Sequence, residues 1–183
     1  MAELATGHLK GVTNGAALVL GSGLGGGIII NGKLFQGSHF QAGELTFLLP
    51  LQMEKLDPSL MQETTLSAIG LITKVNEILA SLDLKDGLLA FKAINAKKEA
   101  VYPIFETYCR NLAITILNLQ TIFDMETFVL GGGISAQSIL IEEVNRQFDK
   151  VHHEIDFIGK IIKRPKIVAC HHNGTNLIGA ACF

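Results

Sequence analysis

A glycine-rich segment near the start of the chain is the first group of residues whose types and spacing could do chemistry. It reads Gly-Ser-Gly-Leu-Gly-Gly-Gly over residues 21–27 and follows an apolar run. Glycines let backbone amides converge on an anion without interference from a Cβ atom, and Ser22 adds a hydroxyl donor. The spacing Gly21-x-Gly23-x-x-Gly26 matches the dinucleotide fingerprint letter for letter, so phosphate binding is the first hypothesis.

The residues after the glycines decide between the known types of phosphate loop. The dinucleotide fingerprint places pyrophosphate at the N-terminus of a helix, whereas the apolar residues 28–30 predict a strand. No Lys-Ser or Lys-Thr pair follows the glycines, which excludes a P-loop. We therefore predict a phosphate-binding loop between two strands. The alternative that these glycines serve only tight packing stays open.

The elements that must position this loop are predicted from apolar periodicity and from turn residues. Strands are expected at residues 16–20 and 28–31, then a hairpin turn at Asn31-Gly32, giving an antiparallel meander; further strands are expected at 127–130 and 166–170. Helices are expected at residues 2–9, 60–79, 88–100, 101–124, 136–151 and 176–183, with Pro103 in a first turn and Ser135 as a cap. The pattern indicates an α/β fold.

Composition and charge exclude several classes of protein. The 183 residues are 48% hydrophobic and carry a net charge of −2, which gives no general attraction to nucleic acid or to an anionic membrane. No apolar run reaches the ~18 residues of a membrane span, so we expect a cytoplasmic protein. The cysteines are far apart and are expected to be small buried residues. The pairs His152-His153 and His171-His172 are expected to be solvated or at helix ends.

Four motifs in the same order resemble the ROK family of bacterial sugar kinases and sugar-responsive repressors. Residues 21–27 resemble its GTGIGGG loop, Ala42-Gly43-Glu44 its AGE, residues 130–135 its LGGGIS, and residues 176–181 its closing GLIGAA. The resemblance covers nearly the whole chain. It implies a lobe of the ribonuclease-H-like, actin and hexokinase type, with a mixed sheet flanked by helices.

The resemblance also implies a role for each motif, in an ATP-dependent hexose kinase similar to glucokinase or fructokinase. The loop of Gly21, Ser22, Gly23, Gly25 and Gly26 would bind the β- and γ-phosphates of ATP, with Mg²⁺ held mainly by the nucleotide. The adenosine would lie against Gly131, Gly132 and Gly133. Hydroxyl groups of the sugar would be bound by Glu44 and Glu63, because paired carboxylates grip vicinal hydroxyls.

The chain departs from the family pattern around the sugar site. Phe47 stands where the family commonly has a histidine that touches the sugar, and residues 48–62 contain no cysteine, so no structural zinc is expected. His39 and Gly174 also differ from the family's usual residues. The identity of the sugar therefore stays open.

The family's catalytic aspartate and its first phosphate loop, of the D-x-G-G-T type, are not in this sequence. We expect residues 1–183 to be a single C-terminal lobe with no catalytic residue of its own, inactive without the N-terminal lobe. Two other functions stay open: the lobe of a sugar-responsive regulator, and a non-catalytic dimerisation module. Family members usually pair through this lobe, so a homodimer is expected, and the apolar helix at 101–124 is compatible with one.

Overall fold

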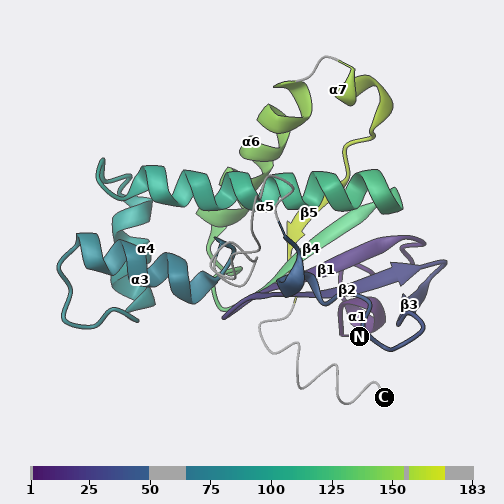
Figure 1. The fold of residues 1–183 in the computed structure, drawn as a ribbon, viewed down its shortest axis with the longest axis horizontal. Coiled ribbons are helices and arrows are strands. Elements are labelled where there is room, and N and C mark those ends of the chain that lie inside the picture. The colour runs from purple at the N-terminus through teal and green to yellow at the C-terminus, as the bar shows by residue number, and fades with distance from the viewer. Residues whose placement is uncertain (1, 50–64, 155–156, 172–183) are drawn as a thin grey trace.

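The computed structural model describes residues 2–49, 65–154 and 157–171, and these form a five-stranded mixed sheet with helices around it (Figure 1). The strands are β1 Gly15–Leu20, β2 Leu24–Ile30, β3 Lys33–Phe35, β4 Thr127–Gly132 and β5 Lys166–Ala169, in the order β3-β2-β1-β4-β5. The pairs β1–β2 and β2–β3 are antiparallel, whereas β1–β4 and β4–β5 are parallel. The predicted meander and the later strands are confirmed.

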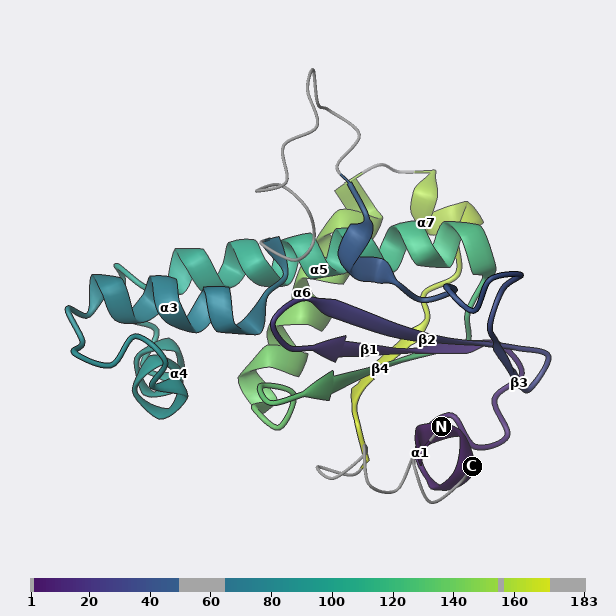
Figure 2. The same ribbon diagram turned by 60° about the horizontal axis from the view of Figure 1, so that its bottom comes forward.

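The helices are α1 Ala2–Thr6, η1 Leu45–Phe47, α3 Ala68–Ile78, α4 Gly87–Asn95, α5 Tyr102–Phe123, α6 Ser138–Glu154 and α7 Ile158–Ile161. Helix α5 runs along one face of the sheet and α1 lies on the other, while α3 and α4 extend beyond the end of the sheet (Figure 2). No helix in the described part of the chain is long and apolar enough to cross a membrane.

The main core lies between the sheet and helix α5. From the sheet it takes residues such as Leu18 and Leu130, and from α5 residues such as Phe105, Leu112 and Ile116, all fully buried. The predicted helix is confirmed, including Pro103 in its first turn, where a missing amide proton costs little.

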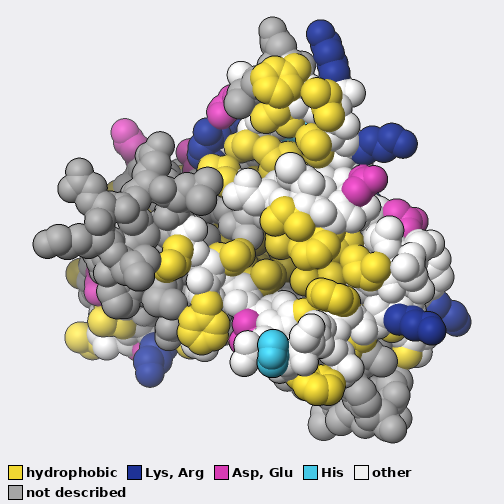
Figure 3. Space-filling view, turned by 45° about the vertical axis from the view of Figure 1, so that its right-hand side comes forward, with side chains coloured by type: hydrophobic (Ala, Val, Ile, Leu, Met, Phe, Trp, Pro, Cys, Tyr) yellow, Lys and Arg dark blue, Asp and Glu magenta, His cyan; other side chains and the backbone are white. Residues whose placement is uncertain are grey.

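On the side turned toward β3 and α7, apolar side chains gather in a hollow of the surface (Figure 3).

Several predicted helix boundaries are wrong: the helix expected at 2–9 ends at Thr6, that expected at 136–151 runs to Glu154, and three further boundaries have a local cause. Residues 60–64 of the helix predicted at 60–79 lie outside the described residues; the rest is not continuous, because α3 begins at Ala68, where Ser67 is its N-cap and accepts a hydrogen bond from the Gly70 amide at 3.0 Å. Helix α4 ends at Asn95, shortly before Lys97 takes a left-handed conformation with φ 48°. Ser135 caps no helix, since its hydroxyl donates to the Gly132 carbonyl at 2.8 Å and α6 begins at Ser138.

The predicted surroundings of histidine and cysteine hold only in part. His152 lies in the last turn of α6 as expected, but it is buried rather than solvated, with Nε2 2.7 Å from the Ile162 carbonyl. His171 is exposed, and Cys109 is fully buried whereas Cys170 is half-buried. His172, Cys182 and the helix expected at 176–183 lie outside the described residues.

Candidate functional site

The predicted phosphate loop is a tight hairpin tip. Leu20 pairs with Leu24, so only Gly21, Ser22 and Gly23 join β1 to β2, and a strand follows the glycines rather than a helix. The Gly21 amide donates to the Gly23 carbonyl at 3.1 Å. Across the described residues, the amides of Ser22 and Gly23 and the Ser22 hydroxyl have no hydrogen-bond partner. The tip therefore presents three donors that could bind an anion.

Gly25 and Gly26 lie inside strand β2 instead of in the loop, paired with Val19 and Leu18. The Leu24 amide donates to Oγ1 of Thr46 at 3.0 Å, and that hydroxyl donates to the Leu24 carbonyl at 3.2 Å, so the backbone of Leu24 faces away from β1. Because backbone groups alternate along a strand, those of Gly25 face β1 and those of Gly26 face outward. The glycines assigned to phosphate thus fall into two groups, and only the tip is free of the sheet.

The segment that carries Glu44 is pressed against strand β2. A Cβ on Gly26 would lie 2.7 Å from the Gly43 carbonyl oxygen, and Gly43 has φ +94°, so both positions require glycine. Buried Leu45 anchors the segment, and Glu44 itself is exposed and makes no capping bond with its side chain. Its carboxylate is thus free to accept hydrogen bonds beside the glycine strand. Glu63 lies outside the described residues.

The second glycine loop ends the neighbouring strand at the same edge of the sheet. Gly132 pairs with Leu20, at the end of β1, and has φ +100°; a Cβ there would collide with the Leu20 carbonyl. A Cβ on Gly133 would meet no described atom within 4 Å, so this residue borders open space. The tip and the loop of Gly131, Gly132 and Gly133 thus lie together at the carboxyl ends of parallel strands, the usual ligand-binding edge of α/β sheets.

The hairpin tip is also tied to the helical part of the molecule. The Gly21 carbonyl accepts a hydrogen bond from the Ala68 amide at 2.8 Å, in the first turn of α3. Just before this helix, the Leu66 carbonyl accepts a hydrogen bond from the Tyr108 hydroxyl of α5 at 3.1 Å. These bonds fix the position of the tip relative to α3 and α5.

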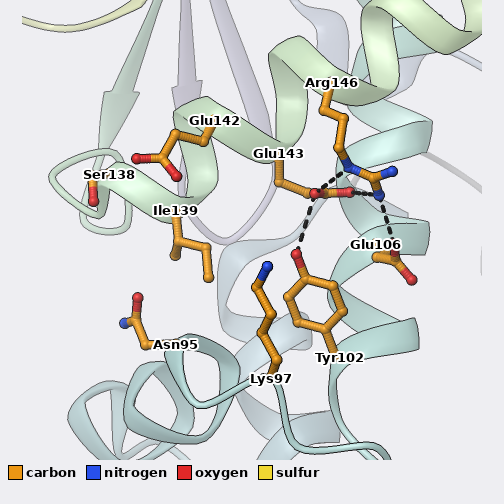
Figure 4. A pocket seen from close by; sticks show the side chains of 9 residues that line it. All are labelled: Asn95, Lys97, Tyr102, Glu106, Ser138, Ile139, Glu142, Glu143 and Arg146. Atoms are coloured by element: carbon orange, nitrogen blue, oxygen red, sulfur yellow. Dashed lines mark hydrogen bonds and ion pairs between the residues drawn. The ribbon is translucent and has the colours of Figure 1, made fainter.

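A pocket of about 610 Å³ opens between the end of α4, the start of α5 and α6, the helix that follows the second glycine loop (Figure 4). Its lining is mostly polar and charged: Asn95, Lys97, Tyr102, Glu106, Ser138, Ile139, Glu142, Glu143 and Arg146. This volume lies within the range of roughly 300–1,000 Å³ that small-molecule pockets occupy.

A buried carboxylate, that of Glu143, organises one wall of the pocket. Arg146 donates to both of its oxygens, at 2.8 and 2.6 Å, Gln147 donates at 2.7 Å and the Tyr102 hydroxyl at 3.3 Å. Burial by itself raises the pKa of Glu143, but these hydrogen bonds outweigh it, so the pKa lies below its ordinary value. Burial and the nearby charge of Glu143 raise the pKa of Tyr102. The charges of this wall are therefore already paired with one another, Arg146 with Glu143 and Glu106.

Two charged groups of the pocket have no ion-pair partner among the described residues. The Lys97 ammonium lies 5.4 Å from the centre of the Tyr102 ring, in a cation–π contact, and it points into the pocket (Figure 4). Glu142 is exposed on α6, one turn after Ser138. The pocket thus offers one cation and one carboxylate to a ligand. The periodicity of the sequence gives no sign of this pair, because Lys97 lies in the turn after α4 whereas Glu142 lies on α6.

A family model, described as the ROK family, matches residues 1–183. N-acetyl-D-glucosamine kinase of Vibrio cholerae is 29% identical, in an alignment that covers 96% of this chain and 60% of that enzyme. The chain thus spans about 60% of the length of this relative.

Two solved structures share the fold. A ROK family protein from Streptococcus pneumoniae in complex with sucrose has a TM-score of 0.80 at 30% identity, over 98% of this chain and 60% of that one. A ROK family glucokinase from Streptomyces griseus, in complex with glucose and AMPPNP, has a TM-score of 0.81 at 21% identity, over 99% of this chain and 63% of that one. The expected α/β lobe of the actin and hexokinase type, a mixed sheet flanked by helices, is confirmed.

Proposed function

The chain belongs to the ROK family, and on that premise we propose that it is the nucleotide- and sugar-binding lobe of an ATP-dependent hexose kinase. One observation carries the proposal: the unpartnered donors of Ser22 and Gly23 lie beside the Gly132 and Gly133 loop, at one edge of the sheet. Free donors at the end of one strand, beside an open glycine loop at the end of the next, suit an extended polyanion such as a triphosphate.

In this proposal the nucleotide spans the two glycine loops. The β- and γ-phosphates bind at the hairpin tip, where Gly21, Ser22 and Gly23 leave room for close backbone approach, and Mg²⁺ is held mainly by the phosphates. The nucleoside lies against Gly133 and reaches toward the pocket beside α6, where Lys97 and Ser138 offer donors. The open space at Gly133 supports this path.

The sugar, in the same proposal, binds on the side of Glu44. An exposed carboxylate next to the glycine strand can accept hydrogen bonds from two neighbouring hydroxyl groups. Glu63 is proposed as the second acceptor. Exposed Phe47 adds an apolar surface against a ring face, and relatives named as sugar kinases support a hexose as the substrate class.

Transfer of a phosphoryl group to a hydroxyl also needs a base to accept the hydroxyl proton and donors on both sides of the triphosphate. We assign the base and the first phosphate loop to an N-terminal lobe that is not in this sequence. The present chain then supplies binding and positioning, in a cytoplasmic enzyme, and by itself turns over no substrate. Adding the missing lobe is expected to give hexose-dependent release of ADP.

Calorimetric titration of the chain with MgATP tests the nucleotide site. Gly133→Val fills the open space beside the loop and is expected to weaken binding at least tenfold. Gly27→Val is the matched control: a Cβ there also meets no described atom within 4 Å, but Gly27 lies in β2 on the sheet face that α1 covers. Equal binding by Gly133→Val and the unmodified chain would overturn the assignment of this loop to the nucleotide.

A further inference from the structure

The short helix α7 lies beyond α5, on the side away from the sheet, and its outer side is both apolar and basic (Figures 1 and 2). Phe157, its N-cap residue, is 61% exposed, and Ile161 is 70% exposed. Residues three or four positions apart share one face of a helix, so Phe157, Lys160 and Ile161 lie on the same face. At this end of the molecule apolar side chains lie beside lysine and arginine side chains (Figure 3).

The opposite face of α7 anchors the helix to the rest of the molecule. Ile158 and Ile162 pack against the main core. The Ile162 carbonyl accepts a hydrogen bond from Nε2 of His152 at 2.7 Å, and this histidine is buried and stacked on the ring of Phe148. Helix α7 is thus held by its inner face, and packing among the described residues does not account for the two apolar side chains on its outer face.

Positive charge surrounds these two exposed apolar side chains. Residues 157–166 contain four lysine or arginine residues and no acidic one. Lys160, Lys163 and Lys166 are exposed and form no ion pair within the described residues, whereas Arg164 is paired with a carboxylate of α6 at 2.6 Å. The chain as a whole has a net charge of −2, so its basic groups are concentrated locally at this end.

An anionic membrane surface is the partner whose chemistry fits this helix best. Two apolar side chains one helical turn apart can enter the headgroup region, while lysine side chains beside them reach the lipid phosphates. The acidic side chains at the end of α6, Asp149 and Glu154, are each held by an arginine, which reduces their repulsion of a negative surface. An acidic peptide would be expected in a groove, whereas α7 projects from the molecule (Figure 1).

We propose that α7 and the residues up to Lys166 form a surface that binds the anionic headgroups of a lipid bilayer. Phe157 and Ile161 enter the boundary between headgroups and acyl chains, and Lys160 and Lys163 bind lipid phosphates. A contact with so few basic and apolar groups is reversible and is weakened by salt. The surface contains none of the residues assigned to nucleotide or sugar, so this proposal goes beyond the proposed function and its failure would leave that function untouched.

Cosedimentation of the full chain with lipid vesicles tests the proposal. The chain is expected to bind vesicles of phosphatidylcholine and phosphatidylglycerol in equal parts at least tenfold more tightly than vesicles of phosphatidylcholine alone. Rising salt concentration is expected to release it, because the electrostatic part of the contact is screened. Equal binding to the two kinds of vesicle, or binding to neither, would overturn the proposal.

Exchange of the outer apolar side chains shows whether α7 makes the contact. Phe157→Ser combined with Ile161→Ser is expected to weaken binding to the mixed vesicles at least tenfold, and thermal unfolding checks that the fold is intact. The matched control is Leu82→Ser combined with Leu88→Ser, which removes two exposed apolar side chains between α3 and α4 and is expected to leave binding unchanged. Equal losses in the two double variants would contradict a contact through α7.

Reversal of charge tests the role of the lysines in the same assay. Lys160→Glu combined with Lys163→Glu is expected to abolish the preference for phosphatidylglycerol, whereas the control, Lys85→Glu combined with Lys92→Glu, changes two other exposed lysines and is expected to retain it. If a polyglutamate peptide binds the chain and vesicles do not, an acidic protein is the partner and the proposal is wrong. Slower sedimentation of the lipid-free Phe157 and Ile161 double variant, with unchanged vesicle binding, would instead assign the surface to a second copy.

Discussion

Single residues at the hairpin tip decide how an anion could be held. The Ser22 and Gly23 amides are free within the described chain, whereas Gly25 faces β1 inside the sheet. Leu24 is turned away from β1 by the hydroxyl of Thr46. The spacing of the glycines in the sequence predicts a loop between two strands, and the structure has such a loop at residues 21–23. The spacing treats all the glycines alike, because the hydrogen bond that distinguishes them comes from a residue 22 positions away.

Glu44 provides the test at the residue scale. Glu44→Gln keeps the shape of the side chain but removes its charge, so hydrogen bonds to sugar hydroxyls become weaker by roughly half. Hexose binding to the chain, followed by ligand-observed NMR, is expected to weaken about tenfold. Glu99→Gln, a change of another exposed glutamate away from the glycine strand, serves as the control. Loss of hexose binding to the same extent in both variants would contradict the role of Glu44.

At the scale of elements, helices α5 and α6 are joined by ionic contacts as well as by apolar packing. Arg146 of α6 reaches Glu106 of α5 at 2.6 Å while it also holds Glu143, and Arg110 of α5 pairs with Glu154 of α6 at 2.8 Å. The exposed pair Arg110–Glu154 adds little to stability. The main contribution that depends on pH is expected from Glu143, since its carboxylate is buried, whereas Glu154, whose pKa Arg110 also lowers, is exposed.

The pKa of Glu143 is lowered in the folded state, so its charged form stabilises the fold. That contribution is present above the unfolded pKa of about 4.3 and is lost as the pH falls through the lower folded value. Denaturant unfolding across the acidic range is therefore expected to show a loss of free energy of unfolding. Glu143→Gln is expected to lower stability at neutral pH and to flatten this dependence.

Glu142→Gln is the matched control for this pH dependence, because Glu142 is the neighbouring residue on α6 and is exposed. Its unfolding is expected to follow the unmodified chain at each pH. If the free energy of unfolding falls as steeply with acid in Glu143→Gln as in the unmodified chain, other carboxylates cause the loss. Glu143 would then have no measurable part in holding α5 and α6 together.

Elements with strong periodicity could be predicted from the sequence, and their ends could not. Helix α5 and the meander follow from apolar spacing and from the Asn31-Gly32 turn, which the structure places between β2 and β3. The start of α3 and the end of α4 depend on Ser67 and on the left-handed Lys97. A serine within a helical pattern and a lysine after one are common, so spacing alone does not mark them as boundaries.

For the whole molecule, the decisive feature is the parallel pairing of β1 with β4. It brings residues 21–23 and 131–133, more than a hundred positions apart, to one edge of the sheet. Local pattern could not give this juxtaposition, because it depends on which strands become neighbours. The resemblance to the ROK family did predict it. The pocket beside α6 was predicted by neither, since it combines the ends of three helices.

The most direct test of the account is an NMR titration of the labelled chain with MgATP that follows every backbone amide. The largest shifts are expected at Ser22, Gly23, Gly132 and Gly133, with smaller ones at Lys97 and Ser138 beside the pocket. Amide shifts confined to the sheet face under α1, or no shift at millimolar nucleotide, would contradict the claim that the two glycine loops together bind a triphosphate.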